Sequence, residues 1–232
     1  MAGGVEVAQV EESRSRFRYL CVEVLVLCSL HLPSIIGAVL ARPERTTADV
    51  YAKNATFHVV MLLAWLAIYL FVMVTDDEPL TYFGISPWRW KRDLTVFALF
   101  VPVLFLEWFG SQELARIAKP LFSHAQLSPL WLVAAVGLTT AVFEETVFRG
   151  YLVPRLEEIT GKAWIAVIGS ASFYAVTGIS LGPIGMLGNF LFGLVAGAAF
   201  VNYRSLWPLI SIHAIMSVWA LSSAVSAFHG GR

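Results

Sequence analysis

The sequence predicts an all-α protein, a polytopic membrane bundle of about seven transmembrane helices. Three observations support this prediction. Hydrophobic residues make up 58% of the 232 residues, and charged residues make up only 14%. Mean hydropathy is +0.72, which is too high for a soluble globular domain. The apolar stretches also approach the roughly 20 residues that a helix needs to cross about 30 Å of hydrocarbon.

The N-terminal half is expected to hold three spans. Residues 1–18 are predicted to form a polar tail. The apolar run over 19–40 is longer than a signal-peptide core, so we expect a retained first span that is kinked near Pro33. The second and third spans are predicted over 57–75 and 94–109.

An interfacial segment is predicted between the second and third spans, over 76–93. Aromatic and basic side chains alternate there, as they do in helices that lie on a membrane surface. These side chains are Trp88, Arg89, Trp90, Lys91 and Arg92.

The C-terminal half is expected to hold four spans. The fourth helix is predicted to begin at Ser128 and Pro129, because serine caps a helix and proline suits its first turn. We expect one long helix to about Glu158, ended by Gly161. The remaining spans are predicted over 163–180, 185–202 and 206–228.

The sequence indicates one membrane domain over 19–232, with the functional motifs in 128–218. No internal repeat and no separate soluble domain is visible. Gly193 and Gly197 form a small-xxx-small pair, which lets the sixth helix pack closely on a neighbour.

The charge distribution predicts partners and orientation. The formal net charge of +0 gives no sign of a nucleic-acid partner, and the composition indicates the lipid bilayer instead. Lysine and arginine are enriched in the segments that face the cytoplasm when the N-terminus lies inside. The small size and short loops are typical of a bacterial inner-membrane protein. The only cysteines, Cys21 and Cys28, lie in the first span and are expected to act as small hydrophobes.

An acidic motif follows the apolar run of the fourth span. Glu144 and Glu145 come after a stretch, 130–142, that contains no charge. A charge in hydrocarbon costs about 2.5–3.5 kcal/mol by insertion scales, so adjacent carboxylates indicate a functional site. Glu145 and Arg149 are four apart and share a helical face, whereas Glu144 lies about 100° away. We expect Glu145 to pair with Arg149 and Glu144 to face a cavity; the alternative is a charge cluster at a helix end.

A second polar feature is His213, in an otherwise apolar turn of the seventh span. Taken alone, such a histidine is more often a packing residue than a catalyst. At about 1.5 Å per residue, however, Glu144 and His213 both fall in the inner half of the bilayer. Ionisable groups inside a membrane usually face one another or a water-filled cavity. An acid beside a histidine can activate water.

These residues resemble the CPBP family of glutamic-type intramembrane proteases. The family includes CAAX-processing endoproteases, bacteriocin-processing and immunity (Abi) proteins, and myxosortase-like enzymes that process C-terminal anchors. The resemblance covers about 128–218 and implies a helical membrane bundle around a hydrated cavity, with peptide-bond hydrolysis as its chemistry. It rests on Glu144-Glu145-x-x-x-Arg149, Phe173, and Ser205-Leu206-Trp207-Pro208 leading to His213.

The resemblance implies a role for each matched position. Glu144 would be the base that activates water, with Glu145 and Arg149 organising it. His213 would donate a hydrogen bond to the oxyanion.

The chain departs from the family pattern at two positions. The family places a histidine four residues after the phenylalanine, where this chain has Thr177. The family also places an asparagine four residues after the later histidine, where this chain has Ser217. Thr177 would then hold the water by its hydroxyl, and Ser217 would be a weaker helper of His213.

No metal and no other cofactor is expected. A zinc site needs about three protein ligands, and Arg149 is expected to occupy Glu145, which leaves Glu144 and His213. Thr177 replaces an imidazole with a neutral hydroxyl, which is a poor ligand for zinc.

Three functions are compatible with these residues. We favour an intramembrane endopeptidase that acts on a membrane-anchored protein or peptide, in CAAX-type or C-terminal sorting-anchor processing. The alternative is a catalytically weak or inactive pseudoprotease, serving as a membrane scaffold or immunity protein, because the second-motif histidine is absent. A third reading is a small transporter with Glu144 and Glu145 as a proton or cation relay, but no inverted repeat supports it.

Overall fold

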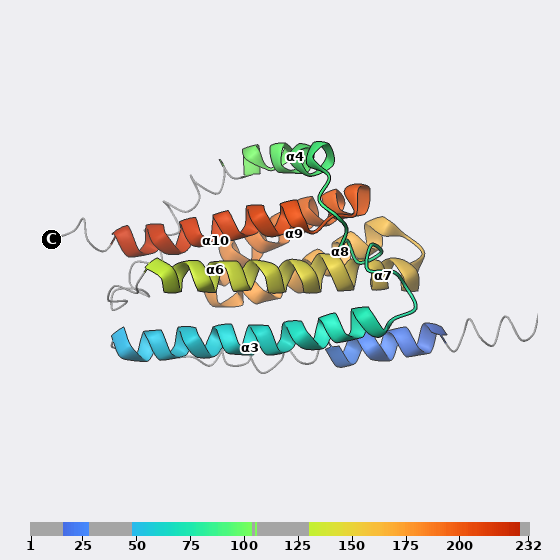
Figure 1. Cartoon of the computed structure of the whole chain (residues 1–232), viewed down its shortest axis with the longest axis horizontal. Helices are drawn as coiled ribbons and strands as arrows, with labels where there is room; N and C mark the ends of the chain where they lie inside the picture. The colour runs from blue at the N-terminus through green and yellow to red at the C-terminus, as the bar shows by residue number, and fades with distance from the viewer. Residues whose placement is uncertain (1–15, 28–47, 104, 106–129, 228–232) are drawn as a thin grey trace, which may run out of the picture.

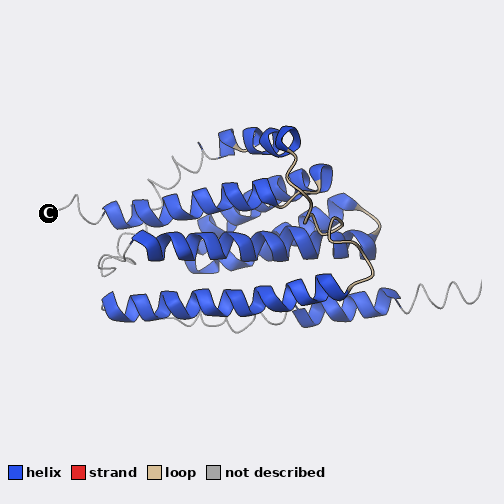
Figure 2. Cartoon of the chain, in the orientation of Figure 1, coloured by secondary structure: helices blue, strands red, loops and turns tan. Residues whose placement is uncertain are grey.

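The computed structural model describes residues 16–27, 48–103, 105 and 130–227. Over these residues the chain is all-α, and loops and turns join the helices (Figure 2). The all-α part of the predicted fold class is confirmed for this part of the chain. Four predicted features lie outside the described residues: the tail up to residue 15, Cys28, the kink near Pro33, and the helix start at Ser128 and Pro129.

A helix over residues 16–27 precedes the named elements. These are α3 (Ala48–Thr75), α4 (Trp90–Leu99), α6 (Leu130–Glu144), the π-helix η1 (Glu145–Leu152), α7 (Val153–Thr160), α8 (Ala163–Thr177), the 3-10 helix η2 (Gly178–Leu181), α9 (Gly182–Tyr203) and α10 (Trp207–Ala227).

The long helices pack side by side as a bundle (Figure 1). α6 lies between α3 and α10 and contacts both, while α8 packs extensively against α9. α4 lies against α10 on the side away from α6. The acidic motif at the end of α6 is therefore surrounded by other helices, and every residue of η1 is buried.

The predicted fourth helix is not one regular α-helix. α6 ends at Glu144, η1 continues with π-helical geometry to Leu152, and α7 then resumes the α-helix. Short π-helical segments inside α-helices are frequent at functional sites. Gly161 ends α7 in a left-handed conformation with φ of 65°, as predicted, because glycine has no Cβ to clash there.

Gly193 and Gly197 of α9 pack closely on a neighbouring helix, as the small-xxx-small pattern predicted, and that neighbour is α8. A Cβ at position 193 would lie 2.9 Å from the Cα of Ala171, and one at position 197 would lie 3.0 Å from a methyl group of Val167. The two backbones are therefore nearly in contact, which fixes how the side chains of neighbouring turns meet.

The third predicted span begins earlier than the apolar pattern indicated. α4 starts at Trp90, inside the predicted interfacial segment, and stops at Leu99. Phe100 closes the helix by donating its N–H to two carbonyls of the preceding turn. The chain is helical again over residues 101–103, so the helix is interrupted at Phe100, and Pro102 accounts for the interruption because it has no N–H to continue the ladder. The end of the predicted span, 106–109, lies outside the described residues.

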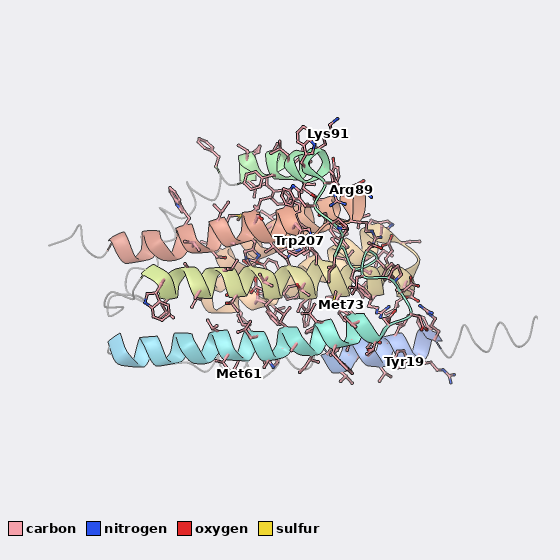
Figure 3. All side chains as sticks on the ribbon, viewed as in Figure 1. Tyr19, Met61, Met73, Arg89, Lys91 and Trp207 are labelled. Carbon is pink, nitrogen blue, oxygen red and sulfur yellow. The ribbon has the colours of Figure 1, made fainter. Side chains whose placement is uncertain are left out.

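The predicted interfacial side chains divide into two groups. Trp88 and Trp90 are exposed, and Lys91 points away from the bundle in Figure 3. Arg92 instead turns inward and donates hydrogen bonds to the buried Asp93 and to Ser205, which precedes α10. Their adjacent positions in the sequence did not show that Lys91 would lie on the surface while Arg92 would link α4 to the start of α10.

The described helices establish fewer membrane spans than the sequence predicts. Among them, α9 alone is both long and apolar enough to cross a membrane by length and composition. Shorter apolar segments cover Val59–Thr75, Ala163–Thr177 and Trp207–Trp219. The expectation of about seven spans therefore remains a proposal.

A network of ion pairs joins three segments at one end of the bundle. Arg155 of α7 is fully buried and lies over the ring of Tyr151. Tyr151 in turn donates a hydrogen bond of 2.5 Å to Glu23 of the N-terminal helix. The ion pairs of Arg155 reach Glu23, Asp76 and Glu158.

Candidate active site

Glu145 and Arg149 of η1 form a buried ion pair. The distance from Glu145 Oε1 to Arg149 Nη1 is 3.0 Å, and neither side chain exposes more than 1% of its surface. The pair expected from their four-residue spacing is therefore present. A buried carboxylate requires such a partner, so Arg149 both compensates Glu145 and fixes its position.

His213 of α10 lies between the two carboxylates. Its Nδ1 is 2.8 Å from Glu145 Oε1, and its Nε2 is 3.6 Å from Glu144 Oε2. Only the first of these is a hydrogen-bond distance. Because Glu145 accepts a hydrogen bond from Nδ1–H, the ring is oriented and Nε2 is the nitrogen that faces Glu144.

The two glutamates have different surroundings although they are adjacent. Glu145 has no exposed side-chain surface, whereas the Glu144 side chain keeps 18% of its surface exposed. The change from α-helix to π-helix falls between them, since Glu144 ends α6 and Glu145 begins η1. Arg149 and His213 thus hold the Glu145 carboxylate, while the Glu144 carboxylate remains partly exposed.

Two aromatic rings cover this group of charges. The Arg149 guanidinium lies over Tyr174 of α8 and Phe192 of α9, 4.5 and 5.2 Å from the ring centroids. The His213 ring contacts the same two rings, with centroid distances of 6.3 and 5.3 Å. Cation–π contacts strengthen when they are desolvated, so both helices help to hold Arg149.

The region that carries this site matches a known protein family. Residues 126–219 match the family model described as type II CAAX prenyl endopeptidase Rce1-like. This part of the chain is similar to that family, and we refer to residues 126–219 below as the Rce1-like domain. The family is membrane-embedded, its members are proteases, and their substrates are proteins or peptides. The comparisons with curated proteins and with solved structures found no match.

Thr177 of the Rce1-like domain is hydrogen-bonded away from the glutamates. Its hydroxyl donates to the carbonyl of Tyr174 at 2.7 Å and accepts from Nδ2 of Asn189 at 3.0 Å. Among the described residues, no hydrogen bond joins Thr177 to Glu144 or Glu145. Sequence reasoning missed Asn189, although an amide in the middle of the apolar helix α9 was an available signal.

Ser217 of the Rce1-like domain lies at a contact between α6 and α10. It is half-buried, one turn beyond His213, and a Cβ at Gly137 would lie 3.4 Å from its own Cβ. Small residues are common at such contacts. Its suggested help to His213 remains a prediction.

The Rce1-like domain offers few donors for a metal ion. Within the described part of the chain, no group of three or more His, Cys, Asp or Glu side chains is suited to hold one. Glu145 Oε1 is taken by Arg149 and His213, which leaves Glu144 and His213 Nε2 as the free pair. That is fewer than the roughly three protein ligands of a catalytic zinc site.

Proposed function

We propose that this protein is an intramembrane endopeptidase that hydrolyses a peptide bond of a membrane-associated protein or peptide. The observation that carries the proposal is the place of His213 between a fixed carboxylate and a partly exposed one, within an Rce1-like domain. Such a set supplies a base, an oriented imidazole and a compensating cation. CAAX-type processing and C-terminal sorting-anchor processing are the two candidate reactions.

Glu144 is the proposed general base. Its carboxylate takes a proton from water, and the water oxygen attacks the carbonyl carbon of the scissile peptide bond. When the tetrahedral intermediate collapses, the C–N bond breaks and the proton on Glu144 passes to the leaving amine. The step consumes one water and produces a carboxyl end and an amino end.

His213 is the proposed donor to the oxyanion. Because Nδ1–H is engaged by Glu145, Nε2 is the nitrogen that can reach a substrate carbonyl. Nε2 donates a hydrogen bond when the ring is an imidazolium. The formal charges of the four ionisable groups then sum to zero, which suits an interior of low dielectric constant.

Buried polar atoms support the presence of water at this site. Glu145 Oε2 and Arg149 Nη2 are buried without a hydrogen-bond partner among the described residues. Buried polar groups without protein partners commonly bind ordered water, since leaving one unsatisfied costs about 1–3 kcal/mol. Water at this point is also the second reactant of the proposed hydrolysis.

We also propose about seven spans, a cytoplasmic N-terminus and a bacterial inner membrane as the location. The ion pairs of Arg16 with Glu158, of Arg155 with Asp76 and of Arg204 with Glu157 support the placing of these segments on one side of the membrane. They join segments that the charge bias assigns to the cytoplasmic side.

Comparative membrane proteomics of cells that carry the wild type or Glu144→Ala tests the proposed activity. We expect precursors to stay uncleaved in the variant and their processed termini to appear in the wild type. Identical terminal peptides in both strains would contradict the protease and favour the second candidate.

The second candidate is a weak or inactive pseudoprotease that acts as a membrane scaffold or immunity protein. The observation that favours it is the engagement of Thr177. Its one hydroxyl proton goes to the carbonyl of Tyr174, so it is not available to donate to Glu144 or to a bound peptide. A protein of this kind would bind a membrane segment equally well with Glu144→Ala.

A further inference from the structure

The guanidinium of Arg92 links α4 to the turn that precedes α10. Its Nη2 donates a hydrogen bond of 3.0 Å to the hydroxyl oxygen of Ser205, which is buried. Its Nε and Nη2 also donate to the two carboxylate oxygens of Asp93, at 2.8 and 3.1 Å. Asp93 has no exposed surface and accepts a further bond of 2.6 Å from the backbone N–H of Arg89. Because both oxygens of a fixed carboxylate hold the guanidinium, its direction toward Ser205 is fixed as well.

Two further hydrogen bonds hold the start of α10. The backbone N–H of Leu206 donates to the carbonyl of Gly84 at 3.1 Å, and the indole N–H of Trp207 donates to the carbonyl of Ser86 at 2.7 Å. Together with the bond from Arg92, they tie positions 205, 206 and 207 to the segment over residues 84–93. That segment precedes the Rce1-like domain, and the proposed reaction assigns no role to it.

The position of α10 determines where His213 lies. α10 is one continuous helix from Trp207 through His213, which at about 1.5 Å per residue lies about 9 Å along the axis. A displacement of the start of the helix therefore displaces the imidazole. The distance from His213 Nδ1 to Glu145 Oε1 is 2.8 Å. Since such a bond extends to about 3.2 Å, a displacement of about 1 Å is enough to break it.

We propose that Arg92 is a positioning residue that fixes the start of α10 through Ser205 and so keeps His213 Nδ1 on Glu145. The proposal rests on the proposed protease function, because Arg92 acts through the oxyanion donor of that reaction. Lys91 carries the same charge at the neighbouring position but points away from the bundle (Figure 3).

Arg92→Ala and Ser205→Ala test this role, with Lys91→Ala as the matched control. Arg92→Ala and Lys91→Ala each remove one positive charge, at adjacent positions of α4. Ser205→Ala removes the link to α10 and leaves the Arg92–Asp93 pair intact, so it decides the question if Arg92→Ala does not fold.

Two measurements are made on each purified variant in detergent. The first is the NMR chemical shifts of the two ring nitrogens of His213, in protein made with isotope-labelled histidine. These shifts report which nitrogen carries the proton and whether it is hydrogen-bonded, and His213→Gln identifies the signals. The second is the kcat and KM for a precursor found by the proteomic comparison.

We expect Arg92→Ala and Ser205→Ala to shift the His213 signals and to lower kcat about 10-fold, with KM nearly unchanged. The reason is that a misplaced catalytic group slows the reaction while the contacts that bind the substrate remain. Lys91→Ala should leave the signals, kcat and KM at the wild-type values. A loss of stability alone would reduce the amount of folded protein without shifting the signals of the folded fraction.

His213 signals that are unchanged in folded Arg92→Ala or in Ser205→Ala overturn the proposal, whatever happens to kcat. Shifted signals with an unchanged kcat overturn it as well, and so does an equal shift in Lys91→Ala. If neither the wild type nor any variant cleaves a precursor, the protease function fails, and the His213 signals alone still decide whether Arg92 positions His213.

Discussion

Glu144 and Glu145 are adjacent and chemically identical, but their surroundings differ. Glu145 is held by Arg149 on its own helix and by His213 from α10, and it has no exposed surface. Glu144 keeps some exposure and meets His213 at a longer distance. Substitutions that break the Glu145–Arg149 pair should therefore have different consequences from substitutions of Glu144.

Arg149→Ala should destabilise the protein, and Glu144→Gln should not. Removing Arg149 leaves the buried Glu145 poorly compensated, which costs about 3–5 kcal/mol when one member of a buried pair is lost. Glu144→Gln keeps the shape of the side chain and removes the base, so we expect near-normal thermal unfolding and no cleavage. Thermal unfolding in detergent and cleavage of a precursor are the two measurements. Equal destabilisation by both substitutions would refute this division of roles.

Chelation should not abolish proteolysis. The proposed chemistry uses a carboxylate, a water and an imidazole, and the donors left free by Arg149 are too few for a stable zinc site. Purified protein treated with a chelator should keep its activity, and elemental analysis should find no stoichiometric zinc. Activity that is lost to the chelator and restored by zinc alone would show that a ligand has been missed.

At the scale of the elements, the contact between α8 and α9 positions the aromatic cover of the site. α8 carries Tyr174 and α9 carries Phe192, and the two rings lie 6.1 Å apart between centroids. The close approach at Gly193 brings them together, since Gly193 meets the backbone of Ala171 one turn from Tyr174. The packing of these helices is thus linked to the geometry around Arg149.

Gly193→Ala should therefore cost both stability and activity. The added Cβ would lie 2.9 Å from the Cα of Ala171, so the helices must separate, at a cost of about 1–3 kcal/mol. Gly188→Ala is the control, because a Cβ there meets nothing within 4 Å. In a helix interior this change is neutral or stabilising by up to about 1 kcal/mol. Equal melting temperatures for the two variants would contradict the close packing.

At the scale of the whole molecule, acidic residues that precede the Rce1-like domain form ion pairs with a buried arginine inside it. Glu23 and Asp76 precede the matched region 126–219, and both pair with Arg155 inside it. Tyr82 makes a further link, because its hydroxyl donates to the carbonyl of Pro154 at 3.1 Å. The N-terminal half therefore satisfies polar groups that the matched region buries.

Stability should fall at alkaline pH in part through Tyr82. Burial, followed by the nearby charge of Glu158, raises the pKa of Tyr82 from 10.0 to about 12. The folded state therefore favours the neutral phenol, and this contribution is complete below pH 10 and disappears as the pH rises from about 10 to about 12. Melting temperatures across that window should decline less steeply for Tyr82→Phe than for the wild type. Parallel curves would exclude this contribution.

The sequence by itself determined the features that depend on neighbouring residues. The apolar runs indicated helices, the four-residue spacing gave the Glu145–Arg149 pair, and Gly161 marked a helix end. Gly193 and Gly197 likewise indicated a close helix contact, although not which helix would meet them. These features follow from local geometry, which is encoded in a few consecutive turns.

Only the tertiary structure decided how the site is assembled. His213 is 68 positions from Glu145, and nothing local specifies which ring nitrogen meets which carboxylate. The π-helical turn at Glu145, the inward turn of Arg92 and the place of Tyr174 also depend on how separate helices pack. A periodic pattern states which face of a helix is buried, but the partner on that face is chosen by the packing of the whole bundle.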